Sequence, residues 1–230
     1  MHTIFIFLLS IALWANGVSA QSRMARQLEA IGFIDIAKAD SSIAIDLRYT
    51  RADNFTGKVL YTELKEAYLH PLAMESLKRA QQILKREYPQ YSLMVWDATR
   101  PLDVQQEMWD LVKGTPQHIY VSNPANGGGL HNYGLAVDVT ILGADGKPLS
   151  MGTPFDHFGK EAHITHEEEL VKKGKITAQE RANRLLLRRV MREAGFRTLN
   201  SEWWHFNRVS RKEAHKNFKV VRTDLAEDDD

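Results

Sequence analysis

The chain has 230 residues, of which 43% are hydrophobic and 26% are charged, so it can bury a core and is not a disordered protein. Its 30 Lys and Arg residues nearly balance 29 Asp and Glu residues, and the net charge of +1 gives no support for binding to nucleic acid or to an anionic membrane. The sequence contains no cysteine, which excludes disulfides, thiolate nucleophiles and zinc fingers, so any metal must be bound by His, Asp or Glu.

The first twenty residues differ from the rest and predict a secretory signal peptide, residues 1–20. An almost unbroken apolar run extends from Thr3 to Trp14, and the small residues Val18 to Ala20 precede the expected cleavage site. The run of about 12 residues is shorter than the roughly 20 that a transmembrane helix needs. We therefore expect a periplasmic or secreted protein with no membrane anchor after cleavage. An uncleaved N-terminal anchor is the alternative, because no Lys or Arg precedes the run.

The first half of the remaining chain mixes strand and helix signals. Ser42–Tyr49 alternates partly between apolar and polar residues and predicts a strand. Pro71 predicts the first turn of a helix that ends before Pro89, because proline loses no hydrogen bond at that position. Tyr91–Trp96 predicts a short buried strand, and Pro101 predicts the start of a second helix.

The second half begins with a segment rich in Asn and Gly. Further along, Thr177 and Glu180 match a capping box, in which each side chain accepts a hydrogen bond from the other residue's backbone. The expected elements are a loop over Asn123–Gly129, a strand over Leu135–Ile141, a long polar loop over Met151–Lys175 with one helical turn, a helix from Thr177 to Gly195, and a strand–turn–strand over Phe196–Phe206.

This order of elements predicts the α+β class, because helices and strands are mixed without strict alternation. We expect a single domain over residues 21–223, with a central antiparallel sheet flanked by helices. Residues 224–230 form an acidic tail that we expect to lie outside the domain. No other apolar stretch is long enough to span a membrane.

The segment around Asp138 carries the first chemical signal. In a strand over Leu135–Ile141, Asp138 lies on the face opposite Val137 and Val139, beside the small residue Ala136. A carboxylate in the middle of a buried strand needs a partner, since its desolvation costs several kcal/mol. A divalent metal held by Asp138 and by His131, just upstream, would satisfy it. The alternative is a structural Asp bonded to backbone, with an exposed His.

The second signal is Glu202 followed three residues later by His205, both next to aromatic side chains that exclude water. His-Glu-x-x-His sites likewise carry a metal ligand and a general base on one secondary-structure element. Together, His131, Asp138 and His205 make three ligands, the number that catalytic zinc takes in addition to water, and Glu202 would be the base. The alternative is a buried His in an aromatic core with a surface Glu.

Arg100 carries the third signal, because it follows a predicted strand and precedes a predicted helix. A guanidinium there can stabilise the oxyanion that forms when water attacks a carbonyl. The alternative for Arg100 is a salt bridge to Asp97 or Asp103.

Taken together, these segments resemble the D-alanyl-D-alanine dipeptidases, zinc enzymes of the D,D-peptidase family that are related to the Hedgehog fold. The zinc motif of that family is Ser-x-His-x-x-Gly-x-Ala-x-Asp, its Glu-x-x-His motif matches Glu202 to His205, and its strand-end Arg-Pro matches Arg100-Pro101. Asp46–Gly57 and Met151–Asp156 also resemble the dipeptidase branch. The positions that fit the zinc motif are His131, Gly134, Ala136 and Asp138.

The resemblance implies a role for each matching residue. The cofactor would be one zinc ion per chain. The substrate would be a small D,D-dipeptide such as D-Ala-D-Ala, which the enzyme would hydrolyse. The sequence departs from the motif at Gly129, which replaces the leading Ser that lies near the substrate in that family. The implied roles are zinc ligands for His131, Asp138 and His205, general base and later acid for Glu202, stabilisation of the tetrahedral intermediate for Arg100, and substrate contacts for Tyr49 and Asp97.

Two other functions remain open on sequence grounds. A D,D- or L,D-carboxypeptidase acting on peptidoglycan stem peptides would use the same site in an open cleft, and a zinc-bearing wall-binding module would need no base. His157, His163 and His166 invite a second-metal hypothesis, but their polar, Glu-rich surroundings favour a solvated loop, which could also form a lid. The oligomeric state is left open.

Overall fold

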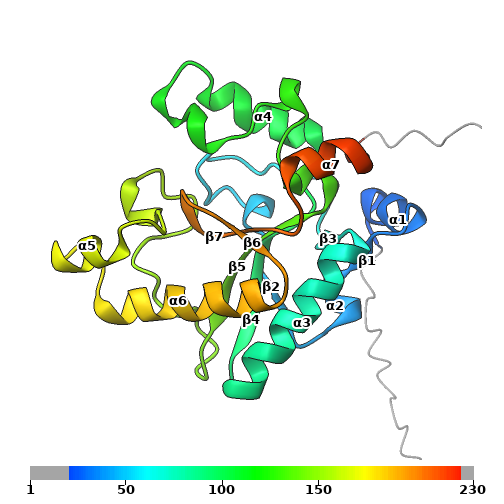
Figure 1. The fold of residues 1–230 in the computed structure, drawn as a ribbon. Helices are drawn as coiled ribbons and strands as arrows, with labels where there is room; N and C mark the ends of the chain where they lie inside the picture. The colour runs from blue at the N-terminus through cyan, green and yellow to red at the C-terminus, as the bar shows by residue number, and fades with distance from the viewer. Residues whose placement is uncertain (1–20, 224–230) are drawn as a thin grey trace, which may run out of the picture.

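Five strands form the central sheet of the computed structural model, which describes residues 21–223 (Figure 1). The predicted signal peptide and acidic tail lie outside the described residues. The chain is of mixed α and β composition, as expected. In spatial order across the sheet, the strands are β2 (Ala44–Ile45), β4 (Ser92–Asp97), β5 (Ala136–Leu142), β7 (Glu202–Asn207) and β6 (Arg197–Leu199).

The sheet is mixed, whereas the sequence predicted an antiparallel one. β4, β5, β7 and β6 pair antiparallel with their neighbours, but β2 runs parallel to β4 at the edge. The reason lies in the connection between these two strands, which includes β3 (Tyr68–Leu69) and helix α3 (Pro71–Glu87) and is long enough for a parallel crossover. β3 itself pairs with β1 (Ile34–Asp35) in a second, two-stranded sheet.

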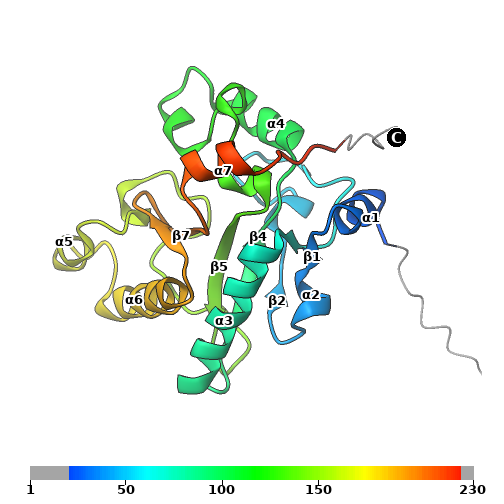
Figure 2. The same cartoon turned by 45° about the vertical axis from the view of Figure 1, so that its right-hand side comes forward.

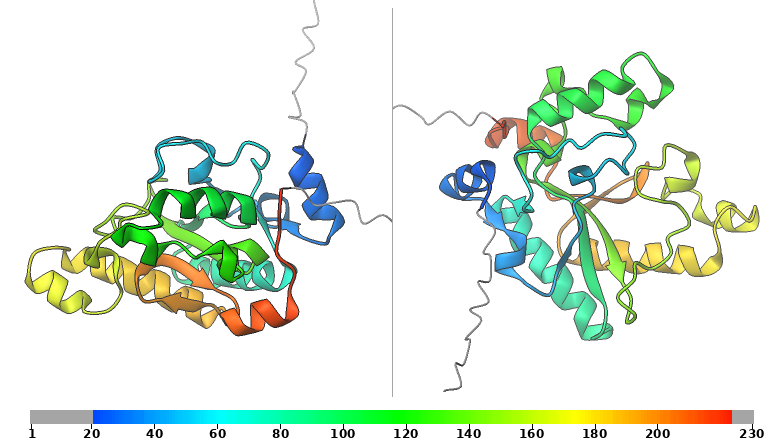
Figure 3. Two further views of the ribbon diagram at one scale, coloured as in Figure 1. Left: turned by 90° about the horizontal axis from the view of Figure 1, so that it is seen from above. Right: turned by 180° about the vertical axis from the view of Figure 1, so that it is seen from behind.

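Two long helices, α3 and α6 (Ala178–Glu193), lie side by side on one face of the sheet, as the views from the front (Figure 1) and from behind (Figure 3, right) show. The predicted starts of these two helices are confirmed. Pro71 occupies the first turn of α3. The Thr177 side chain accepts from the Glu180 backbone N–H, and the Glu180 carboxylate accepts from the Thr177 N–H at 2.7 Å, so the capping box is formed.

The remaining helices are short, and α4 and α7 lie together at one end of the sheet (Figure 2). Of these, α4 agrees with the helix predicted after Pro101, whereas α1, α2 and α7 were not predicted. No helix within residues 21–223 is long and apolar enough to cross a membrane. The bounds are α1 (Arg23–Ala30), α2 (Ile36–Ala39), α4 (Leu102–Val112), α5 (Glu167–Lys172) and α7 (Arg211–Asn217), with 3₁₀ turns at Arg48–Thr50, Pro116–Tyr120, Pro124–Asn126, Leu130–Tyr133 and Lys160–Ala162.

The predicted strand over Ser42–Tyr49 is much shorter in the structure. After Asp46 donates its backbone N–H to Val95 at the sheet edge, the chain turns into a 3₁₀ helix at Arg48–Thr50 and buries the Tyr49 side chain. The segment predicted as a polar loop over 151–175 contains a 3₁₀ turn and α5, which is more regular structure than the single helical turn expected.

Candidate metal centre and substrate cavity

Three polar side chains lie in one row across the middle of the sheet. Asp138 on β5 pairs with Asp97 on β4 and with His205 on β7. Directly opposed residues of antiparallel strands project to the same face. The row therefore places two carboxyl groups and an imidazole next to one another, on the sheet face opposite the Val137 and Val139 side chains.

His131 reaches this row from the 3₁₀ helix at Leu130–Tyr133, which leads into β5. Gly134 makes the link between helix and strand, with a φ of 62° that favours glycine. A Cβ atom at Gly134 would lie 2.3 Å from Cε1 of Phe33 and 2.9 Å from the backbone nitrogen of His70. The glycine of the motif is thus required both by the turn and by the close approach of neighbouring groups.

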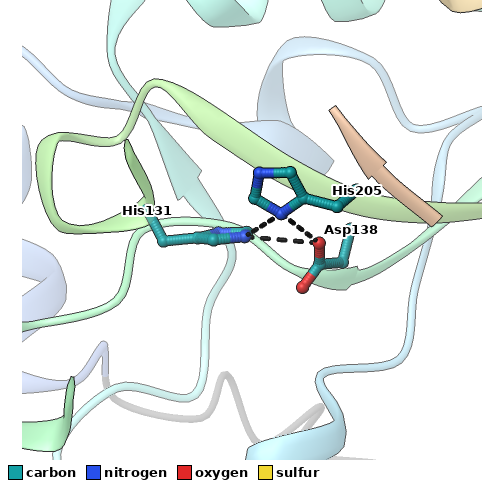
Figure 4. A group of neighbouring side chains, drawn as sticks. All are labelled: His131, Asp138 and His205. Atoms are coloured by element: carbon teal, nitrogen blue, oxygen red, sulfur yellow. Dashed lines mark hydrogen bonds and ion pairs between the residues drawn. The ribbon is translucent and has the colours of Figure 1, made fainter. Parts of the chain in front are cut away.

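The structure brings the three predicted metal ligands together (Figure 4). His131 Nε2 lies 3.1 Å from His205 Nδ1 and 3.3 Å from Asp138 Oδ1, and His205 Nδ1 lies 3.0 Å from Asp138 Oδ1. Atoms that share one tetrahedral zinc ion at about 2.0–2.1 Å are separated by roughly 3.3–3.4 Å. All three side chains are buried, and together they could hold a metal ion.

Each imidazole is oriented by a hydrogen bond from its other ring nitrogen. His131 Nδ1 lies 2.7 Å from the Ala98 carbonyl oxygen, and His205 Nε2 lies 2.8 Å from Asn207 Oδ1. With oxygen acceptors at those nitrogens, His131 Nε2 and His205 Nδ1 are the nitrogens placed to bind a metal ion together with Asp138. Sequence reasoning missed Asn207, although its place two residues after His205 puts it on the same strand face.

Burial and neighbouring charges shift the pKa values of Asp138 and Glu202 in opposite directions. Burial raises the pKa of Asp138, but the neighbouring His131 lowers it more, so the net pKa lies below the usual range and the group is ionised. Burial raises the pKa of Glu202 to about 7. Glu202 begins β7, and its Oε2 lies 3.9 Å from His205 Nδ1. A carboxyl group able to exchange a proton near neutral pH therefore stands beside the metal centre.

The Arg100 side chain lies on the cavity wall, and Asp97 and Gln105 hold its guanidinium group by hydrogen bonds. Its Nε and Nη2 donate to Asp97 Oδ2 at 3.0 and 2.5 Å, and its Nη1 donates to Gln105 Oε1 at 2.8 Å. The ion pair with Asp97 is present, yet Nη2 also lies 3.9 Å from Asp138 Oδ2 and the side chain lines the cavity. Asp103 is turned toward Arg222 instead.

The two predicted substrate contacts occupy different places. Asp97 is fully buried behind Arg100, where it also accepts a hydrogen bond from Tyr61, so its carboxylate positions the guanidinium. The Tyr49 hydroxyl lines the cavity and donates to the Asp156 carboxyl group at 2.9 Å. Burial raises the pKa of Asp156 to about 8, and the charge of Asp138 adds to the effect. The site predictions did not include Asp156, although it closes the Met151–Asp156 motif.

These groups surround one cavity of about 350 Å³. Within the described residues, neither α3 nor α6 lines it, so it lies on the face of the sheet away from those helices. Phe158 stacks against Tyr120 with ring centroids 5.2 Å apart and meets Phe55 edge-on at 5.0 Å. Three loops that are distant in sequence thus contribute an aromatic wall.

The other histidines of segment 151–175 stand apart from the centre. His163 Nε2 lies 3.3 Å from the Tyr120 hydroxyl, and His157 Nε2 lies 3.5 Å from Glu161. Over residues 21–223, the only group of three or more ligating side chains close enough to share an ion is His131, Asp138 and His205. A second metal centre therefore finds no support in the described part of the chain.

Comparison with known proteins assigns this chain to a family of peptidases. A family model described as peptidase M15, D-Ala-D-Ala dipeptidase, matches residues 29–223, and the chain belongs to this family. It is similar to the D-alanyl-D-alanine dipeptidase of Escherichia coli, with 32% identity over 173 residues that cover 75% of this chain and 82% of that protein. The D-alanyl-D-alanine dipeptidase of Enterococcus faecium is 26% identical over 81% of this chain and 95% of its own. The family expected from the sequence motifs is confirmed.

Proposed function

We propose that this protein hydrolyses D-Ala-D-Ala and related D,D-dipeptides, with one zinc ion held by His131, Asp138 and His205. The observation that carries the proposal is the convergence of these three ligands with Glu202 and Arg100 in one cavity. Membership of the D-Ala-D-Ala dipeptidase family supports the substrate class.

The donor set fits zinc. Two neutral imidazole nitrogens and one ionised carboxylate oxygen are a common ligand set for catalytic zinc, which keeps a further position open. When bound, zinc would polarise the scissile carbonyl and lower the pKa of a water molecule. The hydrogen bonds from His131 to Ala98 and from His205 to Asn207 hold the two rings in the tautomers that leave the ligating nitrogens unprotonated.

Glu202 is the proton carrier in this proposal. Its carboxylate accepts a proton from water, holds it on a carboxyl oxygen, and releases it to the nitrogen of the departing amine. A pKa of about 7 suits both transfers near neutral pH, because neither the charged nor the neutral form is strongly favoured. The Trp204 side chain, which also lines the cavity, limits the water around this group.

Arg100 stabilises the negative charge that develops on the carbonyl oxygen. Asp97 and Gln105 hold the guanidinium in place before substrate arrives, so little reorganisation is needed during the reaction. Its ion pair with Asp97 does not remove this role, since the guanidinium still lines the cavity. Asp97 is thus a positioning residue rather than a direct substrate contact.

Asp156 binds the positively charged N-terminal ammonium group of the substrate. The Asp156 carboxyl lines the cavity and is oriented by the Tyr49 hydroxyl. A bound ammonium group would favour the ionised carboxylate and offset the penalty that burial imposes. The cavity of about 350 Å³ lies at the small end of the range for ligand pockets, which favours a dipeptide over a wall polymer.

The decisive experiment measures release of D-Ala from D-Ala-D-Ala by the purified, zinc-loaded protein. We expect turnover by the parent and a loss of about 10²- to 10⁴-fold in kcat for Glu202→Gln, with bound zinc retained. Faster turnover of a stem pentapeptide than of the dipeptide would instead identify a carboxypeptidase. Retention on wall sacculi without hydrolysis of either substrate would identify a binding module.

We also propose that the protein acts in the periplasm or outside the cell. The support is the apolar N-terminal segment with small residues before the expected cleavage site. Cell fractionation followed by N-terminal sequencing of the product tests this location. Recovery of the full-length chain from the cytoplasm would contradict it.

A further inference from the structure

The cavity wall carries a hydroxyl group that the proposed chemistry does not use. Ser122 lines the cavity beside Gly129 and Leu130. Its backbone oxygen accepts a hydrogen bond from Gln105 Nε2 at 2.9 Å. By contrast, its Oγ makes no hydrogen bond to any group within residues 21–223. The Ser122 hydroxyl is therefore held at the cavity with its donor available.

Gly129 keeps the space next to this hydroxyl open. Its φ of −104° and ψ of 178° are ordinary extended values, so the backbone there does not require glycine. A Cβ atom at position 129 would lie 3.0 Å from Ser122 Oγ and 3.4 Å from Ser122 Cβ, which is a tight contact. A side chain at position 129 would thus crowd the Ser122 hydroxyl, and glycine leaves room for it.

A positive charge borders the same wall. Arg211 Nη2 donates to the Gly128 carbonyl oxygen at 2.9 Å and to the Asn126 carbonyl oxygen at 3.3 Å, and the side chain lines the cavity. No carboxylate of the described chain lies within ion-pair distance of Arg211. Since Gly128 and Gly129 are consecutive, the guanidinium and the Ser122 hydroxyl flank one short segment of backbone.

We propose that Ser122 and Arg211 bind the C-terminal carboxylate of the dipeptide. This inference rests on the proposed function, in which the substrate is a zwitterion. A carboxylate needs hydrogen-bond donors and a compensating charge, and the hydroxyl and the guanidinium provide both. Asp156 provides the matching acceptor for the other end of the zwitterion.

Gln105 ties this carboxylate site to the reacting centre. Its Oε1 accepts from Arg100 Nη1 at 2.8 Å, while its Nε2 donates to the Ser122 backbone oxygen. One buried amide therefore sets the spacing between the group that stabilises the oxyanion and the group that binds the carboxylate. Such fixed spacing selects for a substrate in which one amino-acid residue separates the scissile carbonyl from a free carboxylate.

The test replaces Ser122 by Ala and compares D-Ala-D-Ala with D-Ala-D-Ala amide, which lacks the carboxylate charge. We expect Ser122→Ala to raise KM for the free dipeptide about 10-fold or more and to leave kcat nearly unchanged, because a hydrogen bond to a charged group is lost. KM for the amide should not change. Thr198→Val, which removes another hydroxyl from the cavity wall, serves as the matched control and should not alter KM.

Two further measurements separate binding from folding and from catalysis. Calorimetric titration of D-Ala-D-Ala into Glu202→Gln and into Glu202→Gln/Ser122→Ala should show the same loss in affinity without turnover. The double variant Ser122→Ala/Gly129→Ser returns a hydroxyl to the wall from the neighbouring position and should recover part of the affinity. Arg211→Gln should weaken binding of the dipeptide and not of its amide.

The outcomes distinguish this inference from the proposed function. If the parent hydrolyses D-Ala-D-Ala and Ser122→Ala keeps the parental KM and affinity, the inference is overturned and the function stands. Equal losses for the dipeptide and its amide also overturn it, since the carboxylate would then not be the bound group. If the parent neither hydrolyses nor binds the dipeptide, both proposals fail.

Discussion

Asn207 Oδ1 lies 2.8 Å from His205 Nε2, the ring nitrogen opposite the one that faces Asp138. We predict that Asn207→Ala weakens zinc binding about 10- to 100-fold, because the ring loses the partner that fixes its tautomer and orientation. Asn207→Asp keeps an acceptor at the same place and should retain tight binding. Competition with a zinc chelator measures both affinities. Equal affinities for Asn207→Ala and the parent would show that the contact does not orient the ligand.

Metal content provides a second prediction. His131→Ala, Asp138→Ala and His205→Ala should each lose stoichiometric zinc, because two remaining donors leave the ion largely exposed to exchange with water. His163→Ala is the matched control, since this histidine lies outside the cluster and its side chain contacts the Tyr120 hydroxyl instead. Elemental analysis of the purified variants gives the ratio of zinc to protein. Full zinc content in any of the three ligand variants would contradict the proposed ligand set.

Gly134 and Gly146 form a matched pair for a prediction about stability. Both adopt positive φ, but a Cβ would meet Phe33 and the His70 backbone at Gly134 and nothing within 4 Å at Gly146. Gly146→Ala should cost about 1–2 kcal/mol from backbone strain alone. Gly134→Ala adds an overpacking cost of about 1–3 kcal/mol and should displace His131. Urea unfolding of the two variants, together with their zinc content, checks both parts. A similar loss of stability in both would show that the neighbours of Gly134 yield easily.

The raised pKa of Asp156 predicts a pH dependence of stability. In the folded chain the pKa is about 8, against about 3.9 for an unfolded Asp, so the folded state retains the proton between these values. Unfolding releases that proton. The contribution of this group to the free energy of unfolding therefore falls as pH rises from about 4 to 8. The slope is at most about 1.4 kcal/mol per pH unit, and partial exposure to solvent reduces it.

Asp156→Asn removes this titration. The free energy of unfolding of the metal-free parent should fall relative to that of Asp156→Asn between pH 5 and 8, and the difference should be constant above pH 8. Denaturant unfolding at each pH measures the two curves. Parallel curves over the whole range would show that the folded carboxyl group titrates normally.

Local signals were sufficient for the starts of the two long helices. The starts of α3 and α6 follow from Pro71 and from the Thr177 capping box, because these depend on residues within one turn. The ligand set His131, Asp138 and His205, which the structure brings together, was expected from the residue types in each segment and from the resemblance to the dipeptidase family. Strand alternation explains only why Asp138 faces away from Val137 and Val139, and a buried carboxylate there needs a partner.

Strand register and contacts between residues far apart in the sequence could not be predicted from local patterns. Simple alternation places Asp97 on the same face as Val95, but a bulge at Trp96 shifts the register so that Asp97 opposes Asp138. The fully buried carboxylate could then hold Arg100 from behind. The parallel pairing of β2 also depends on how a long connection crosses the sheet. The partnership of Tyr49 with Asp156 joins residues 107 positions apart, which no local pattern encodes.

The row of Asp97, Asp138 and His205 has a consequence for biogenesis. Three strands that are far apart in sequence must be in register before their side chains share one face, since a slip of one residue would turn Asp138 to the other side. An unfolded polypeptide would therefore present scattered donors of low affinity, and a metal ion would bind only once the sheet has assembled. A chain exported in unfolded form would take its metal from the compartment in which it folds.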